Sequence, residues 1–287
     1  RATFEGIPPE DRYGTHAGTN NASDEELKNP NWIPQPRYFV SEDEVKKALN
    51  VDWGYDWFIG FRNAISAVAD ARSVKFWAMP KYGVGHSIPL LFPDSDPVYS
   101  SVLMANFNTF IVDYVARQKA TGGNLTFYIV RQLPIIPPKD YSDDLILEIV
   151  PRVLELSYTS WDMVKFADDI WNEAGEKLRE RIQEQWNKNT ANLDSRNGMS
   201  CPDWITDRRN VEDNIPISPF VFDSDRRMRI QAEIDAIYAQ LYDLDREELD
   251  HILNSFPIVR QNDINDYGGY RTKNTIIESL NNLGPLR

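Results

Sequence analysis

Short runs of β-favouring residues follow Asp56, and turn residues bound each run. They cover residues 57–61, 74–79 and 88–92, where aromatic and branched side chains stand between Gly, Pro and Asp. The stretch 81–86 holds two glycines, which permit backbone conformations that other residues avoid. The pattern therefore predicts three strands, with a loop between the second and the third.

An almost uniformly apolar segment comes next. Between about residues 98 and 119, apolar positions lie nearly all round a helical projection, which predicts one mostly buried helix. Basic residues in its last turn and the Gly-Gly pair at 122–123 are typical helix stop signals. Residues 125–130 then favour a strand. The run 133–138 favours an extended chain, because its prolines cannot occupy a helix interior.

Helical periodicity dominates the remainder of the chain. Asp245 and Glu248 have the spacing of a capping box, which marks the start of a helix. Residues 190–222 lack periodicity and predict a long loop. The predicted helices cover residues 145–158, 161–169, 176–189, 224–242, 245–254 and 262–282.

The start of the chain is rich in Gly, Pro and Asn and predicts an irregular segment in which order begins only near residue 37. Ser41 and Glu44 then have capping-box spacing, so a short helix is expected there. Together these patterns predict an α+β protein in three parts. They are an irregular N-terminal tail over 1–36, a mixed α/β domain over 37–140 and a mainly helical region over 141–287.

Composition limits the class of protein. Hydrophobic residues make up 41% of the 287 residues, and 13 Phe, 13 Tyr and 8 Trp are enough for a packed core. No apolar run approaches the roughly 20 residues that cross a bilayer, so no membrane partner is expected. The single cysteine, Cys201, forms no internal disulfide and favours a reducing, cytoplasmic setting. The polar start at Arg1, without methionine, favours a piece of a larger protein.

The net charge of −13 is unevenly distributed. Residues 51–139 hold 8 Lys and Arg against 6 Asp and Glu, a net charge of +2, whereas the remaining residues hold 23 against 38, a net charge of −15. Because Lys and Arg neutralise phosphates in nucleic-acid complexes, any such contact is expected within 51–139. The acidic remainder is expected to be a scaffold or a face for another protein.

Residues with catalytic chemistry form no recognisable set. His16, His86 and His251 lie far apart, and no two have the helical spacing of a metal-binding pair. Cys201 lies in a predicted loop without a neighbouring histidine, and no serine nucleophile elbow is present. The sequence therefore predicts neither a metal site nor an enzyme active site in this chain.

Two short motifs partly match nucleotide-binding and methyl-transfer patterns. Gly83-Val84-Gly85 lacks the third glycine of a phosphate-binding loop, and no helix follows directly. Asn29-Pro30-Asn31-Trp32 lacks the second proline of the Asn-Pro-Pro-aromatic motif of adenine methyltransferases, and no hydrophobic strand precedes it. We therefore interpret both as ordinary turns.

The most specific stretch of the chain runs from the end of the long predicted helix to Pro138. A helix that ends in a basic Gly-Gly turn, then Asn124 and the Leu-Pro-Ile-Ile-Pro-Pro run at 133–138, resembles a pattern in restriction-modification proteins. It is similar to that of type I specificity subunits and of the TaqI-like specificity domains of fused adenine-specific DNA methylases. The C-terminal parts of such large methylases are also similar to the segments at 59–63, 83–91, 151–156, 256–260 and 270–273.

This resemblance implies a DNA target-recognition domain over 37–140. It implies a bacterial restriction-modification or phage-defence parent that methylates adenine with S-adenosylmethionine and that in some cases also cuts DNA. The cofactor and the catalytic motifs would lie in an upstream domain of the parent, so no cofactor is expected in this chain. The expected partners are double-stranded DNA, the catalytic methyltransferase domain and other defence-system subunits.

Side chains suited to DNA occur within the predicted recognition domain. Those that can neutralise phosphates are Arg62, Lys75, Lys81, Arg117, Lys119 and Arg131. Those whose amides can read base edges are Gln118, Asn124 and Gln132. Each basic residue has the alternative of being an ordinary solvated charge. Trp53, Trp57, Trp77 and Phe127 can stack on an extruded base, although aromatic residues on strands are more often core.

Two alternatives remain open at this point. The acidic helical part suits a protein-interaction module that links the methylase to other defence subunits. A hydrolase that acts through scattered carboxylates is a further alternative, but no residue constellation selects one pair of carboxylates.

Overall fold

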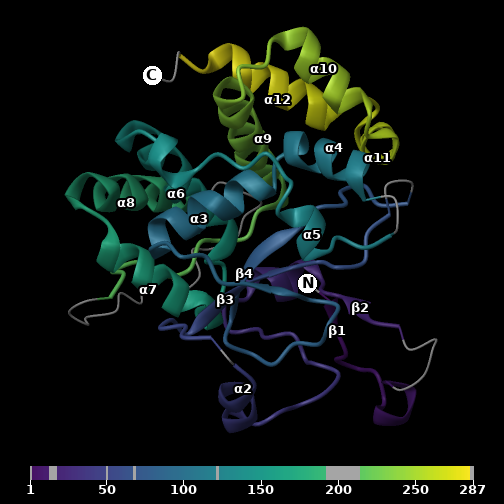
Figure 1. Ribbon diagram of the computed structural model, residues 1–287, viewed down its shortest axis with the longest axis vertical. Coiled ribbons are helices and arrows are strands. Elements are labelled where there is room, and N and C mark those ends of the chain that lie inside the picture. Colours follow the sequence, from purple (N-terminus) through teal and green to yellow (C-terminus); the bar gives the residue numbers. More distant parts are fainter. Residues whose placement is uncertain are drawn as a thin grey trace.

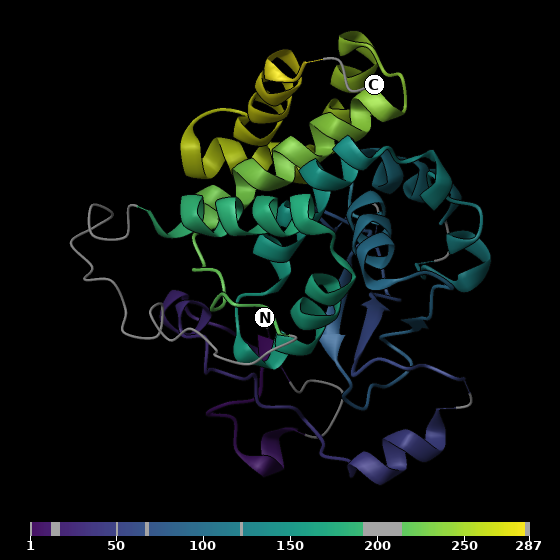
Figure 2. The ribbon, with the colours of Figure 1, turned by 90° about the vertical axis from the view of Figure 1, so that its left-hand side faces the viewer.

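The computed structural model describes residues 2–12, 18–49, 51–66, 69–120, 123–191 and 214–284. It has the predicted α+β architecture, with a small antiparallel sheet and many helices. Figure 1 shows most of the helices above the sheet and the N-terminal segment below it, and the turned view in Figure 2 shows the same arrangement.

The sheet has β3 (Trp57–Phe61) at its centre, flanked antiparallel by β4 (Phe76–Pro80) and β5 (Leu90–Leu91). All five residues of β3 are buried, as expected for a central strand in a core. A Cβ on Gly60 would lie 2.8 Å from Cγ2 of Ile88, so a larger residue there would force the Ile88 side chain to shift. The three predicted strands are confirmed, and the loop at 81–86 is confirmed with them.

The single helix predicted over 98–119 is two helices, α3 (Pro97–Phe107) and α4 (Phe110–Lys119). The break has a tertiary cause. The Asn108 side chain accepts from the Phe76 backbone N–H at 2.9 Å and donates to its carbonyl at 2.7 Å, which ties the end of α3 to β4. Thr109 then caps α4 by accepting from the N–H of Val112 at 3.3 Å.

The strand predicted over 125–130 is wrong, because residues Phe127–Val130 form the one-turn helix α5. Pairing with the sheet region stops early: Asn124 forms an isolated bridge to Ala64, and Leu125 N–H donates to Asn63 at 2.7 Å. Beyond this point the buried apolar residues have the spacing of a helix: Val130 and Leu133, which are three positions apart in the chain, are both buried. The run at 133–138 is extended up to a 3-10 turn at Pro138–Asp140, as predicted.

The helical region is confirmed. The helix predicted over 262–282 is two helices, because Gly268 adopts a left-handed conformation with φ of 75° and ends the first of them. The Asp245 and Glu248 capping box is present. In the loop predicted over 190–222, residues 192–213 lie outside the described part and 214–223 are irregular. The helices are α6 (Asp143–Ser157), α7 (Val164–Glu173, after a 3-10 turn at Trp161–Met163), α8 (Glu176–Thr190), α9 (Ser224–Leu241), α10 (Arg246–Asn254), α11 (Pro257–Tyr267) and α12 (Arg271–Asn282).

Local structure begins before residue 37, earlier than the sequence pattern predicts. A Ser23 and Glu26 capping box, which the sequence contains, starts the first helix. The N–H of Trp161 donates to the carbonyl of Pro30 at 2.9 Å, which attaches this segment to the helical region. Its elements are β1 (Ala2–Thr3) paired with β2 (Asn20–Asn21), a 3-10 turn at Pro9–Arg12, α1 (Asp24–Lys28) and the predicted short helix α2 (Glu42–Ala48).

The described core residues on the two sides of residue 140 belong to one hydrophobic cluster that extends from Trp57 to Ile276. Hydrogen bonds also cross this boundary: the Tyr238 hydroxyl donates to the carbonyl of Val102 at 2.9 Å. The predicted division into 37–140 and 141–287 therefore coincides with no gap in the core. Among the described helices, none combines the length and the apolar character that a membrane span requires.

Candidate functional site

Arg117, predicted to contact phosphate, lies in the core. Its side chain is only 7% exposed, and its Nε donates to Asp113 at 3.0 Å. Its second nitrogen, Nη2, donates to the carbonyls of Asp70 and Ala71, each at 3.0 Å, and the guanidinium lies 4.4 Å from the centroid of the Phe256 ring. This arginine neutralises a fully buried carboxylate, so it is not available to DNA.

Arg62 and Lys81 both interact with residues of neighbouring loops. The Arg62 guanidinium forms an ion pair with Asp70 at 2.9 Å and its side chain is 39% exposed. The Lys81 ammonium donates to the carbonyl of Tyr55 at 3.1 Å and lies 4.0 Å from the Asp56 carboxylate. Both cations therefore stabilise loop conformations, although the Arg62 side chain remains accessible to solvent just after the end of β3.

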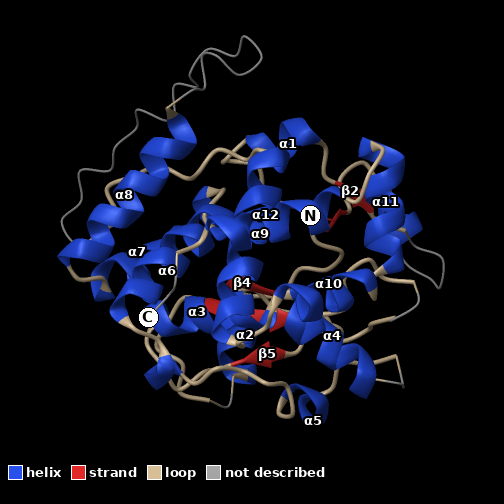
Figure 3. Cartoon of the chain, turned by 90° about the horizontal axis from the view of Figure 1, so that it is seen from above, coloured by secondary structure: helices blue, strands red, loops and turns tan. Residues whose placement is uncertain are grey.

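Four other predicted residues are exposed on α4, on α5 and between these two helices, which are in contact with each other. Gln118 and Lys119 are exposed in the last turn of α4, Asn124 is exposed after the Gly-Gly pair, and Arg131 is exposed at the end of α5. With Tyr128 on α5 they form the surface that we call the α4–α5 surface. Figure 3 shows α5 at the edge of the molecule and α4 beside it.

From Gly123 onward, the α4–α5 surface is anchored on the core. Gly123 adopts a left-handed φ of 77°, and its carbonyl accepts from the N–H of Ile65 at 3.0 Å. Leu125 is completely buried, and the Phe127 ring packs edge to face on Phe61 with centroids 5.4 Å apart. The segment that carries Asn124 and α5 is therefore attached to β3 and to the residues that follow this strand. The amide of Gln132, also predicted, donates to the Tyr128 carbonyl at 2.9 Å.

Of the aromatic residues considered for base stacking, most are structural. Trp57 is 1% exposed, and its indole donates to Asp169 at 2.8 Å. Trp53 packs against Trp57 with centroids 5.3 Å apart. Tyr128, which was not among the predicted residues, is 78% exposed. A strand over 125–130 gave no reason to select it, whereas in the structure Tyr128 lies on a one-turn helix and is exposed, as are Asn124 and Arg131.

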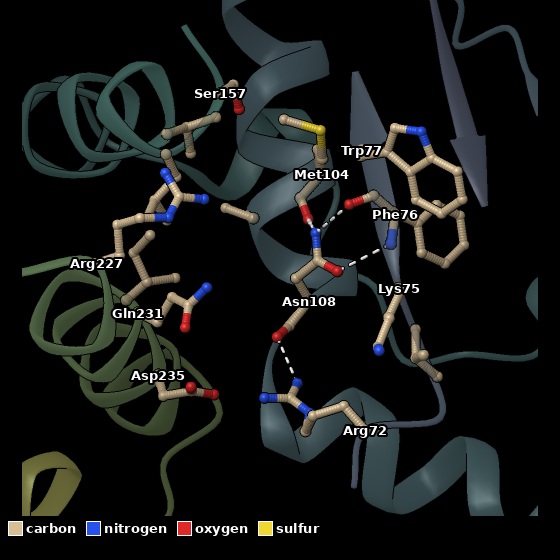
Figure 4. Close-up of a pocket in the computed structure, with 15 residues that line it drawn as sticks. Arg72, Lys75, Phe76, Trp77, Met104, Asn108, Ser157, Arg227, Gln231 and Asp235 are labelled. Carbon is tan, nitrogen blue, oxygen red and sulfur yellow. Dashed lines mark hydrogen bonds between the residues drawn. The ribbon is translucent and has the colours of Figure 1, made fainter. Parts of the chain in front are cut away.

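Lys75 and Arg72 belong to a different feature, a groove of about 540 Å³ between β4 and α3 on one side and α6 and α9 on the other. We call it the β4–α9 groove (Figure 4). Its apolar lining includes Met104, Val153 and Ile234, and Trp77 lies at its edge. The polar side chains that line it include Arg72, Lys75, Asn108, Arg227, Gln231 and Asp235.

One end of the β4–α9 groove is a buried network of charged groups. The Arg72 guanidinium donates to Asp113 at 2.9 Å and to the carbonyl of Asn108 at 2.5 Å, and it lies 3.8 Å from the centroid of the Phe110 ring. Asp235 accepts from the N–H of Phe110 at 2.6 Å. Burial raises the pKa of Asp235 to about 6, against the opposing effects of Arg72 and of this backbone hydrogen bond.

Within the described ranges, no group of three or more His, Cys, Asp or Glu side chains is arranged to hold a metal ion. His86 is exposed in the 81–86 loop and His251 is exposed on α10, whereas His16 and Cys201 lie outside the described residues. A comparison with protein-family models, curated proteins and solved structures gives no match for this chain.

Proposed function

We propose that this chain is a DNA target-recognition module of a bacterial restriction-modification or phage-defence adenine methyltransferase, and that the α4–α5 surface contacts double-stranded DNA. The observation that carries the proposal is that exposed amide and basic side chains lie close together along the chain, in the last turn of α4, at Asn124 and at the end of α5. The resemblance of the helix end and the Leu-Pro-Ile-Ile-Pro-Pro run to specificity domains supports the same assignment.

Local charge favours this surface over the remainder of the molecule. Residues 114–139 include four basic residues and no acidic residue, in a chain whose net charge is −13. Arg117 is buried, so Lys119 and Arg131 are the cations of this surface that reach solvent. An anionic duplex would therefore approach here with the least repulsion from the acidic helices.

We expect the basic and the amide side chains of this surface to contact different parts of the duplex. Lys119 and Arg131 suit phosphate oxygens, which would fix the register on the duplex. Gln118 and Asn124 carry both a donor and an acceptor, which is the pattern needed to read an adenine edge in the major groove. Methyl transfer and S-adenosylmethionine binding would belong to the catalytic domain of the parent, which would be the module's protein partner. The acidic overall charge makes weak DNA binding by the isolated chain the expected result.

Fluorescence anisotropy with a labelled 30-base-pair duplex at increasing salt tests this proposal. We expect salt-sensitive binding that weakens about tenfold in the double variant Lys119→Gln, Arg131→Gln, since each lost phosphate contact removes affinity and reduces the salt slope by about 1. Lys188→Gln is the matched control, because Lys188 is an exposed lysine on α8, at the opposite edge of the molecule (Figure 1). Equal affinities for the double variant and the control, or no salt-sensitive binding at all, would refute the proposal.

A further inference from the structure

The β4–α9 groove is separate from the α4–α5 surface and has no role in the proposed DNA contact. It is built by segments far apart in the chain, from Arg72 to Asp235. Its volume of about 540 Å³ lies in the range of small-molecule sites, which is about 300 to 1,000 Å³. A site of this size holds a compact ligand rather than a protein segment.

The lining is cationic although the chain is acidic. Three cations, Arg72, Lys75 and Arg227, line the groove against one carboxylate, Asp235. Lys75 is exposed, and no described residue forms a hydrogen bond or ion pair with its ammonium group. Arg72 and Asp235 are engaged with Asp113 and Phe110 at one end, so Lys75 is the cation most available to a ligand. Figure 4 shows Lys75 and Arg227 on opposite sides of the groove.

The remaining lining suits an organic group. Met104, Val153, Leu156 and Ile234 supply apolar contact. Gln231 adds an exposed amide for which the structure records no side-chain partner within the described residues. Such a combination of an apolar wall with a few polar groups is typical of small-molecule sites.

We propose that the β4–α9 groove binds a small organic phosphate ester, with the phosphate between Lys75 and Arg227 and the organic part against Met104 and Leu156. Donors on opposite walls favour a phosphate over a carboxylate. A phosphate monoester directs three terminal oxygens away from one centre, whereas a carboxylate has two oxygens in one plane. Asp235 lies on the α9 side below Gln231 (Figure 4), where Arg72 and the N–H of Phe110 partly compensate its charge.

Isothermal titration calorimetry of the full chain with three esters, adenosine 5′-monophosphate, ribose 5-phosphate and phenyl phosphate, tests the proposal. Adenosine, ribose and phenol are the uncharged partners of these probes. We expect at least one ester to bind saturably with Kd below about 1 mM, and its uncharged partner to bind at least tenfold more weakly. Lys75→Met should weaken the ester about tenfold, because it removes a charge-assisted hydrogen bond while retaining the apolar stem.

Lys188→Met is the matched control, because Lys188 is exposed on α8 and belongs to neither the groove nor the α4–α5 surface, and it should leave ester binding unchanged. Since Lys75 is exposed, both variants should keep the melting temperature of the parent chain, which separates lost binding from lost folding. The absence of saturable binding by all three esters, or equal binding by the Lys75→Met variant, would overturn the proposal. Displacement of a bound ester by duplex DNA would also overturn it, since the groove would then belong to the DNA surface.

Discussion

Two buried aspartates contact α4 or its partners in different ways. Asp113 is completely buried, and it accepts from Arg72 at 2.9 Å and from Arg117 at 3.0 Å. Asp235 reaches from α9 to the first N–H of α4, at Phe110, where a carboxylate also faces the positive end of the helix dipole. The first carboxylate is matched by two guanidinium groups, whereas the second is buried without a close ion pair among the described residues.

Because the pKa of Asp235 is raised in the folded protein, we expect the free energy of unfolding to depend on pH through this residue. Its pKa is about 6 in the folded protein against 3.8 ordinarily, so the folded state binds this proton more tightly than the unfolded state. Charged Asp235 therefore destabilises the fold above about pH 6, and this cost disappears as the pH falls towards 4. Asp235→Asn keeps an oxygen for the Phe110 N–H but cannot titrate.

Urea unfolding of both proteins between pH 4 and pH 7.5 measures the effect. The parent should gain stability relative to the Asn variant as the pH falls, by on the order of 3 kcal/mol at most. The difference between the two proteins removes the contributions of the other titrating groups. A difference that stays constant with pH would contradict a raised pKa at Asp235.

Arg117 shows why side-chain roles were harder to predict than the elements that carry them. The sequence places it beside Gln118 and Lys119 at a helix end, which suggested one solvent-facing cluster. The spacing of four between Asp113 and Arg117 was the available signal for an internal ion pair. That spacing occurs on exposed and buried helix faces alike, so only the packing of α4 could decide between them.

At the scale of elements, apolar periodicity located the strands and helices, and local tertiary bonds decided where they break. Asn108 ends α3 because its amide pairs with the backbone of β4, a partner 32 positions away in the chain. Residues 125–130 have strong β propensity but find little sheet edge to pair with beyond Asn124. Neither partner could be identified from one sequence, so the breaks were not predictable.

We predict that Tyr128, on the one-turn helix α5, contributes to duplex binding. Its Tyr128 ring is 78% exposed, so Tyr128→Ala should leave the unfolding midpoint unchanged. The same substitution should weaken duplex binding about fivefold, because an exposed aromatic face can stack on a base or pack on the backbone sugar. Anisotropy titration measures the loss, with Tyr82→Ala, an exposed tyrosine in the 81–86 loop, as the control. Equal affinities for the two variants would exclude Tyr128 from the contact.

At the scale of the whole molecule, the β4–α9 groove could not be predicted from the sequence. Its cations come from the segment before β4 and from α9, and their positions in the chain differ by about 150 residues. The sequence assigned Lys75 to a DNA surface because it lies within the least acidic stretch. Only the packing of α9 against α4 and α6 shows that Lys75 and Arg227 line the same space.

The shared core also predicts how the chain responds to division at residue 140. Phe110 of α4 packs edge to face on Phe256 with centroids 4.8 Å apart, and its N–H is bonded to Asp235. A fragment of residues 37–140 would lose both partners and expose the apolar face that α6 and α9 cover, so it should not fold cooperatively alone. Circular dichroism and urea unfolding of this fragment test the point, and the whole chain under the same conditions is the control. A cooperative transition in the isolated fragment would show that the α/β part is an independent domain, because its own core would then suffice without the helices beyond residue 140.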